Sequence, residues 1–206
     1  MKAKKRIWIG IIVTTVILAA CGCHSKGFSY RTLERHARKE AAEHIDAASE
    51  FYVFENEEDE WARYISVSGD DAKEVFDKII DQRGAYRYAD LPITDAFYMQ
   101  ISERVDDGRN KAWTNIYMIT FETEEAAQDF FDSSHYEGAP SGNGEDYSYV
   151  YSLRKYPRGT VGSCMYLQGR SVMKFYTNMP ISESWDRIRA ICKDFGVIIP
   201  EADQEA

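Results

Sequence analysis

Residues 97–121 have the sequence FYMQISERVDDGRNKAWTNIYMITF, and they contain the clearest structural signal in this 206-residue chain. The first nine residues alternate apolar and polar side chains, which is typical of a strand with one solvent-exposed face. The apolar positions are Phe97, Met99, Ile101 and Val105. A turn signal follows at Asp107-Gly108, and residues 113–121 return as a strand apolar enough to be buried on both faces. The segment therefore predicts an antiparallel hairpin.

The sequence on either side of this hairpin predicts four helices and several further strands. The first helix covers residues 30–48, the second begins at a capping box at Asp71 and ends at Gly84, the third is capped by Thr123, and the fourth runs from Ser182 to Gly196. Strands are predicted at residues 51–54, 64–67, 147–154, 160–168 and 171–177, with a short edge strand at 197–199.

Hairpins rather than single strands separate these helices, so neighbouring strands should be antiparallel. We expect an α+β fold in which a mainly antiparallel sheet carries its helices on one face, with a ferredoxin-like arrangement or repeated ββα units. Residues 30–200 form a single domain in this prediction, and residues 201–206 form a flexible tail.

The N-terminus has the three parts of an export signal. A basic start is followed by the apolar stretch IWIGIIVTTVIL at residues 7–18 and by a small-residue end; the basic side chains are Lys2, Lys4, Lys5 and Arg6. The apolar stretch is short for a membrane span, because a helix needs about 20 apolar residues to cross a bilayer.

Residues 18–21, Leu-Ala-Ala-Cys, resemble the lipobox of bacterial lipoproteins. The resemblance implies that residues 1–20 are a cleaved signal peptide, that Cys21 carries a diacylglyceryl group, and that residues 21–29 are a lipidated tether. It also implies an address at the cell membrane, on its extracytoplasmic face. The alternative is an uncleaved membrane helix that ends in a cysteine. Because two acyl chains hold a protein more stably than one, a lipid on Cys21 would be a durable anchor.

Charge is distributed unevenly along the mature chain. Without residues 1–20 the chain has 21 Lys and Arg against 34 Asp and Glu, a net charge of −13, which argues against a nucleic-acid partner. The segment 26–39 nevertheless has a net charge of +4, from five basic residues against Glu34: Lys26, Arg31, Arg35, Arg38 and Lys39. Since the eight residues 22–29 extend at most about 28 Å, this segment should stay near the lipid headgroups. It is either a contact for anionic lipid or a solvated helix face.

Metal sites and cofactor sites are weakly indicated. His36, Glu40 and His44 share one face of the first predicted helix, but the outer two would lie about 12 Å apart, too far to bind one zinc ion. The acidic runs 55–60 and 143–146 lack the ligand spacing of a calcium loop, and Gly138, Gly142 and Gly144 lack the context of a phosphate loop. We therefore predict no metal and no cofactor.

Signals for nucleophilic catalysis are also weak. Ser163 lies mid-strand between Gly162 and Cys164, which is not the strand-to-helix turn of a hydrolase. Cys164 and Cys192 are either buried core residues or a disulfide that joins a strand to the last helix, a bond that an extracytoplasmic location permits. Cys23 is either a free thiol without a functional role or a second acylation site.

Tyrosines form the most interesting candidate for a binding site. Tyr147, Tyr149 and Tyr151 alternate along one predicted strand and therefore share one face, near three further tyrosines: Tyr156, Tyr166 and Tyr176. Exposed, these rings would form a platform for a partner protein or a glycan. Buried, they would be ordinary cross-strand pairs that stabilise the sheet.

Together these features favour a membrane-anchored, extracytoplasmic lipoprotein whose domain is a non-catalytic binding or interaction module. The alternative is an envelope enzyme, a hydrolase or a metal-dependent protein, that uses His135 or the acidic loops. A concave pocket that joins His135 to carboxylates would favour the enzyme, and an exposed tyrosine face would favour the binding module.

Overall fold

A single sheet organises the chain in the computed structural model, which describes residues 27–52, 60–81, 91–104, 111–135, 137–156, 159–178, 182–200 and 203–204. Its six long strands follow the order β2-β3-β4-β8-β7-β6, and every neighbouring pair is antiparallel. Their bounds are β2 Trp61–Ser68, β3 Ile93–Arg104, β4 Lys111–Phe121, β6 Ser148–Tyr156, β7 Gly159–Gln168 and β8 Ser171–Thr177. Three short strands extend the edges: β1 Glu43–His44 beside β2, and β5 Ser141–Asn143 and β9 Asp203–Gln204 beside β6.

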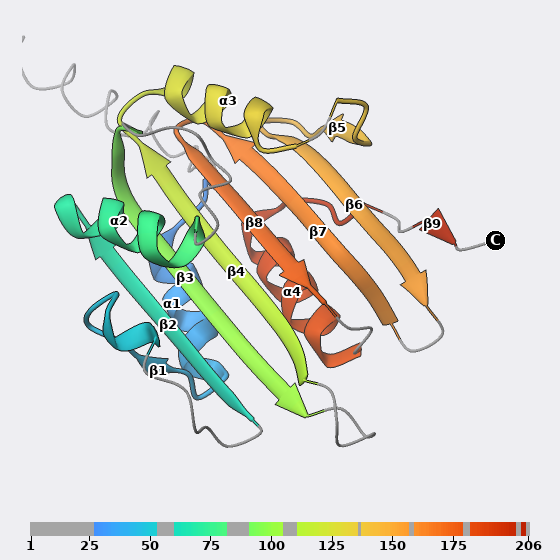
Figure 1. Ribbon diagram of the computed structural model, residues 1–206. Helices are drawn as coiled ribbons and strands as arrows, with labels where there is room; N and C mark the ends of the chain where they lie inside the picture. Colours follow the sequence, from blue (N-terminus) through green and yellow to red (C-terminus); the bar gives the residue numbers. More distant parts are fainter. Residues whose placement is uncertain are drawn as a thin grey trace, which may run out of the picture.

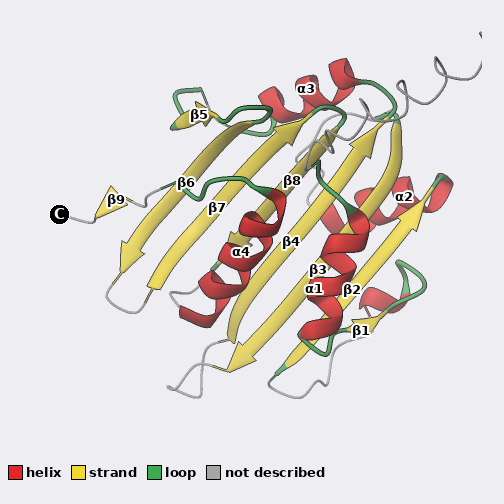
Figure 2. Cartoon of the chain, turned by 180° about the vertical axis from the view of Figure 1, so that it is seen from behind, coloured by secondary structure: helices red, strands yellow, loops and turns green. Residues whose placement is uncertain are grey.

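Helices cover both faces of this sheet (Figure 1). The front face, turned to the viewer in Figure 1, carries α2 Asp70–Val75, the helical turn η2 Phe76–Ile80 and α3 Glu124–Ser133. The back face, seen in Figure 2, carries α1 Tyr30–Lys39 and α4 Ser182–Phe195. The prediction of an α+β fold with a mainly antiparallel sheet is confirmed, but the expectation that the helices pack on one face is wrong.

The reason lies in the central strands, which are apolar on both sides. Successive residues of a strand point to opposite faces. On β3, Phe97 is therefore buried in the back core with Met118, whereas Tyr98 is buried in the front core with Tyr117. Each apolar face has to be removed from water, so each requires its own layer of helices.

The predicted hairpin is present as β3 and β4, with Phe97 opposite Met118 and Ile101 opposite Thr114. The Asp107-Gly108 turn that should connect them lies outside the described residues. The two strands are longer than predicted and pair with β2 on one side and β8 on the other. They thus form the centre of the sheet.

The first helix ends nine residues earlier than predicted, at Lys39 rather than at residue 48. Ala41 has a φ of 53°, and the Ala42 N–H donates to the Ala37 carbonyl at 3.0 Å. This pattern is a Schellman motif, which normally ends a helix at a glycine. Because an alanine occupies the left-handed position, the sequence lacks the usual stop signal. The chain then enters β1 and the short helical turn η1 Glu50–Tyr52, where a strand was predicted at residues 51–54.

Other boundaries follow the sequence more closely. Thr123 caps α3 as predicted, since its Oγ1 accepts a hydrogen bond from the Ala126 N–H. The capping box at Asp71 does not form; α2 begins one residue earlier, behind Gly69, which has a φ of 68°. The edge strand expected at residues 197–199 is irregular backbone, and a two-residue strand, β9, pairs in parallel with β6 further along.

Candidate functional site

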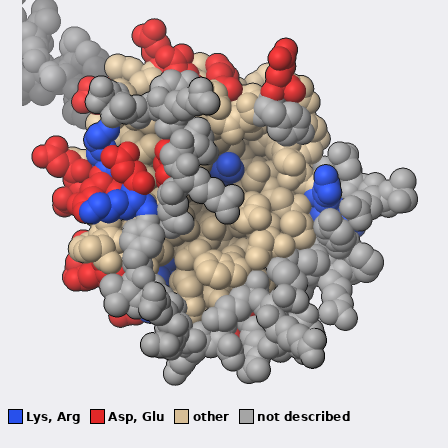
Figure 3. All heavy atoms as spheres, in the orientation of Figure 1, with Lys and Arg blue, Asp and Glu red and all other residues tan. Residues whose placement is uncertain are grey.

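Part of the front face carries none of the described helices. α2 lies against β2 and β3, and α3 lies across one end of β4, β8 and β7, so the other ends of β8, β7 and β6 are uncovered in Figure 1. Figure 3, in the same orientation, shows mainly uncharged atoms over this area, with acidic side chains gathered toward the margins. We call this area the open front face.

The strand register places two rows of side chains on the open front face. Lys174, Met165 and Val150 lie opposite one another on β8, β7 and β6. Two residues further along, the next row consists of Tyr176, Ser163 and Ser152. The first row is half-buried or buried, and in the second row the ring of Tyr176 is 42% exposed.

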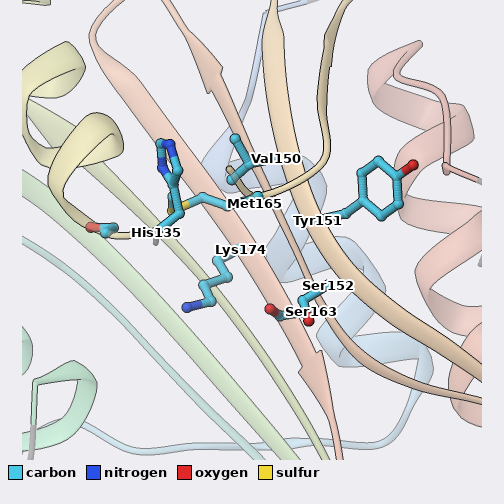
Figure 4. A pocket seen from close by; sticks show the side chains of 9 residues that line it. His135, Val150, Tyr151, Ser152, Ser163, Met165 and Lys174 are labelled. Carbon is cyan, nitrogen blue, oxygen red and sulfur yellow. The ribbon is translucent and has the colours of Figure 1, made fainter. Parts of the chain in front are cut away.

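A hollow of about 90 Å³ lies where these rows meet the end of α3. Its apolar floor is Met165 and Val150, and its polar lining is Lys174 with residues from three segments: Ser134, His135, Ser152 and Ser163. Ala139 and Tyr151 complete the lining, but Figure 4 shows the Tyr151 ring pointing away from the hollow. No carboxylate lines the hollow among the described residues.

His135 does reach this hollow, as the enzyme hypothesis requires, but its ring lies apart from the serine hydroxyls. Its Nδ1 lies 2.8 Å from the Phe131 carbonyl oxygen, so this nitrogen carries the proton and donates it to the helix end. Figure 4 shows the imidazole at one end of the hollow and the hydroxyls of Ser152 and Ser163 at the other. A nucleophile and its base need to lie within hydrogen-bond reach of each other, and this pair does not.

Lys174 is the one cation that lines the hollow among the described residues. Its ammonium and the two serine hydroxyls lie on the same side in Figure 4. By contrast, the half-buried Arg187 is paired with Glu40 and Glu103 at 2.6 and 2.7 Å. The sequence analysis missed Lys174 and Ser152. The available signal was the alternation of faces along each strand, which places Ser152 on the side opposite Tyr151 and Lys174 on the side opposite Phe175.

The three candidate tyrosines of β6 share one side, as predicted, but that side is the back face. Tyr147 is buried, and Tyr149 and Tyr151 are half-buried against the back core. Their rings stack along the strand at centroid distances of 6.2 and 6.3 Å. An exposed platform that includes Tyr147 does not form, because the back face is closed over it.

The segment after α4 closes this part of the back face. The Ile198 N–H donates to the Tyr147 hydroxyl at 2.9 Å, and the Tyr166 hydroxyl donates to the Ile198 carbonyl at 2.8 Å. Ile198 belongs to no strand, so the hydroxyls of Tyr147 and Tyr166 supply the hydrogen bonds that its backbone N–H and carbonyl need. Burial raises the pKa of Tyr166 well above its ordinary value. The side chain of Tyr156 lies outside the described part of the chain.

Cys164 and Cys192 are buried free thiols, so the structure contains no disulfide between them. The Cys192 Sγ donates to the Tyr166 hydroxyl at 3.8 Å. Burial raises the pKa of each thiol to about 12. The sequence left two possibilities open, buried core residues or a disulfide. In the structure, both cysteines are buried core residues. Ser163 lies within β7, as expected, and not at a strand-to-helix turn.

The basic residues of the first helix lie on its outer side. Leu33, His36 and Ala37 form the buried side of α1. Four basic residues line a broad, open surface on the other side, which we call the basic stripe: Arg31, Arg35, Arg38 and Lys39. Lys26 and Cys21 lie outside the described residues.

The expected common helix face of His36, Glu40 and His44 does not form, because α1 ends before His44, which lies on β1. His36 instead lies 2.9 Å from Asp194 of α4, and Glu40 binds Arg187. Within the described ranges, no group of three potential ligands could hold a metal ion. The acidic run 55–60 falls almost entirely outside those ranges.

Comparison with known proteins adds little. The sequence matches no protein-family model and no curated protein. One solved structure, the extracellular domain of PknH from Mycobacterium tuberculosis, aligns with a TM-score of 0.30 and 16% sequence identity over 53% of this chain and 68% of that chain. A TM-score this low supports no argument about fold or function. Among the described helices, none has the length and apolar character needed to cross a membrane.

Proposed function

We propose that this chain is an extracytoplasmic lipoprotein, anchored through a lipid on Cys21, whose domain binds a ligand on the open front face without catalysing a reaction. The observation that carries the proposal is the placement of two features on opposite sides of one sheet. The basic stripe of α1 lies behind the sheet, and the open front face lies before it. A domain tethered on one side can therefore present its site on the other.

The length of the tether and the distribution of charge indicate which side of the domain faces the membrane. Cys21 is separated from the start of α1 by eight residues, so α1 stays within about 28 Å of the anchor. The rest of the mature chain after residue 39 has a net charge of −17, which anionic lipid repels. The basic stripe is attracted to the same surface by about 1 kcal/mol for each residue near the headgroups. We infer that α1 faces the lipid.

Ligand binding is favoured over hydrolysis by the geometry of the hollow. Its polar groups surround an apolar floor, as in binding pockets that hold a ligand by a few directed contacts. The imidazole of His135 and the hydroxyl of Ser163 face different ends, so the enzyme alternative has no assembled base and nucleophile. The hypothesis of a tyrosine platform on β6 is replaced by a site on the other face of the same strand.

Cys21→Ala tests the anchor. We expect the variant to leave the membrane fraction, because it lacks the residue that carries the lipid in this proposal. A variant that stays in the membrane in full amount would refute lipidation at Cys21.

Orientation is tested with a polarity-sensitive dye on single cysteines in a Cys23→Ser background. Glu34→Cys places the dye beside the basic stripe, and Ser152→Cys places it on the open front face. Vesicles with anionic lipid should change the emission of the dye at position 34 and leave the emission of the dye at position 152 unchanged. The reverse result would mean that the front face lies on the membrane.

The charge contribution is tested by reversing Arg31, Arg35 and Arg38 to Glu together. Reversal should abolish the difference between anionic and neutral vesicles. The matched control reverses Arg189 and Lys193, two exposed basic residues of α4. Equal effects of both sets would show that α1 has no special role.

A further inference from the structure

Lys174 is a half-buried cation that pairs with no carboxylate among the described residues. It lies on β8 between Tyr117 of β4 and Met165 of β7, in the middle of the sheet. Partial burial removes some of the water that solvates an ammonium group, and this loss is normally offset by a partner of opposite charge. No Asp or Glu lines the hollow in the part of the chain that the structure describes. The missing partner is the first indication of an anionic ligand.

Two hydroxyls next to Lys174 also have no hydrogen-bond partner in the described part of the chain. Ser163 and Ser152 lie directly opposite each other, and neither side chain hydrogen-bonds to another described residue. Hydroxyl groups both donate and accept, so they suit a ligand that itself carries hydroxyls. They lie on the same side of the hollow as the Lys174 ammonium (Figure 4).

An aromatic ledge borders these polar groups. Tyr176 is 42% exposed and Trp113 is 36% exposed, and they lie diagonally on the adjacent strands β8 and β4. Among the described residues only Ile198 joins them as an exposed large apolar side chain. Asn178 holds the Trp113 backbone through its side-chain oxygen, which accepts from the Trp113 N–H at 2.5 Å. The ledge is thus an exposed aromatic surface next to a cation.

The spacing of these groups matches one monosaccharide. Lys174 and Tyr176 are two residues apart on one strand, hence about 6.7 Å along the sheet, and Ser163 is directly beside Tyr176. The hollow of about 90 Å³ is the volume of about three water molecules, enough for a carboxylate and its first carbon but not for a whole sugar. A sugar ring would therefore lie on the ledge and direct its acidic group inward.

We propose that the open front face binds a sugar acid: the carboxylate pairs with Lys174, ring hydroxyls bind Ser163 and Ser152, and the ring packs on Tyr176 and Trp113. This inference rests on the proposed binding function of the open front face and names its ligand class. A free oxyanion would use Lys174 but not the ledge. A neutral sugar would use the ledge but leave the ammonium unpaired.

The test is ligand-observed NMR on the full lipidated chain in a mild detergent, with D-glucuronate, D-glucose, acetate and inorganic phosphate at one ionic strength. We expect glucuronate to bind more tightly than each of the other three by about tenfold or more, because only glucuronate uses both parts of the site. Lys174→Gln should weaken glucuronate binding by about tenfold or more. Lys193→Gln, an exposed control on α4, should not change it.

A second variant separates the ledge from the cation. Tyr176→Leu should weaken glucuronate and leave the weak affinity for acetate unchanged. Circular dichroism of each variant verifies that the fold is retained, and a variant that unfolds is replaced by Lys174→Met or Tyr176→Ser.

The proposal is overturned if acetate or phosphate binds as tightly as glucuronate, if glucose does so, or if Lys174→Gln binds glucuronate as the unaltered chain does. Failure of the ligand class is distinguishable from failure of the proposed function. If the Ser152→Cys dye contacts lipid, the front face is the membrane face and the function is wrong. If the dye stays in water and glucuronate does not bind, only the ligand class is wrong.

Discussion

Tyr166 and Tyr176 lie on neighbouring strands and differ greatly in their surroundings. Tyr166 points to the back face and is fully buried between Tyr147, Tyr149 and Phe175. Tyr176 points to the front face and is 42% exposed. Strand position explains only the side to which each ring points. The difference in burial comes from α4 and the segment after it, which close the back face, while no described helix closes this part of the front.

The comparison teaches that aromatic content of a strand does not identify a binding surface. Neighbouring strands of one sheet supply a closed tyrosine cluster on one side and an open ledge on the other. Only a face that the helices leave uncovered can bind a ligand, so the position of each helix decides the function of the tyrosines. The four predictions below test this difference, beginning with the largest effect.

Tyr166→Ala should lower the free energy of unfolding by about 3–5 kcal/mol, because it removes a fully buried ring and leaves a cavity. Tyr176→Ala should lower it by about 1 kcal/mol or less, since its ring is exposed. Urea unfolding of both variants measures the two losses. Equal losses would mean that the front ledge is as closed as the back face.

Arg187→Ala should lower the free energy of unfolding by about 2 kcal/mol, because it leaves Glu40 and Glu103 with unpaired charges under α4. Burial opposes the charge of Arg187, but hydrogen bonds to Glu103 and Glu40 outweigh burial and raise its pKa above the ordinary value. Arg189→Ala is the control on the same helix, since its exposed pair with Asp186 is worth less than about 0.5 kcal/mol. A control as damaging as Arg187→Ala would show that α4 is not held by this network.

Alkaline pH should destabilise the closed back face through Cys164 and Cys192. Their pKa is raised from 9.0 to about 12 by burial, so their contribution to stability is complete below pH 9 and is lost as the pH rises toward 12. Raising the pH from 8 to 10 should lower the free energy of unfolding by about 1 kcal/mol for each thiol. Urea midpoints at both pH values measure the loss.

The control for the thiols is the double variant Cys164→Ala and Cys192→Ala, which retains every tyrosine and lysine. Its stability should fall less steeply over the same pH interval. A slope identical to that of the unaltered chain would show that the thiols ionise as freely in the folded as in the unfolded protein.

Asp194→Asn should have the smallest effect, about 0.5 kcal/mol, because the Asp194 side chain is 38% exposed and surface ion pairs are weak. Burial opposes its charge, but the hydrogen bond from His36 and the charge of Arg35 outweigh burial and lower its pKa. A lowered carboxyl pKa stabilises the fold above the ordinary value of 3.8, and the contribution disappears as the pH falls through the folded pKa. Thermal unfolding should therefore show a larger gap between the two proteins at pH 7 than at pH 3.

Several elements could be predicted because their signals are local. Strand β8 was predicted with its exact bounds, residues 171–177, and the cap of α3 at Thr123 was predicted from one hydroxyl. α4 begins at Ser182 and ends before Gly196, as its apolar spacing and the glycine indicate. In each case the residues that set the boundary are neighbours in the sequence.

The candidate site could not be predicted in the same way. Lys174, Ser163 and Ser152 come from three strands, and their meeting depends on the register of β6, β7 and β8. His135 was named for the enzyme alternative, and it does reach the hollow, but the direction of its ring is set by the Phe131 carbonyl at the end of α3. Whether Cys164 and Cys192 form a disulfide or stay free thiols likewise depends on a distance that the sequence does not contain.

The sequence by itself determined the antiparallel pairing of the central hairpin, the alternation of faces along each strand and the uneven charge with its basic segment at residues 26–39. Only the tertiary structure decided that helices cover both faces and that the described helices leave part of the front face open. The physical reason is that burial of apolar surface has no direction. An amphipathic helix is stabilised equally by either apolar face of a sheet, so its own residues do not reveal the face on which it packs, or the face that it leaves to a ligand.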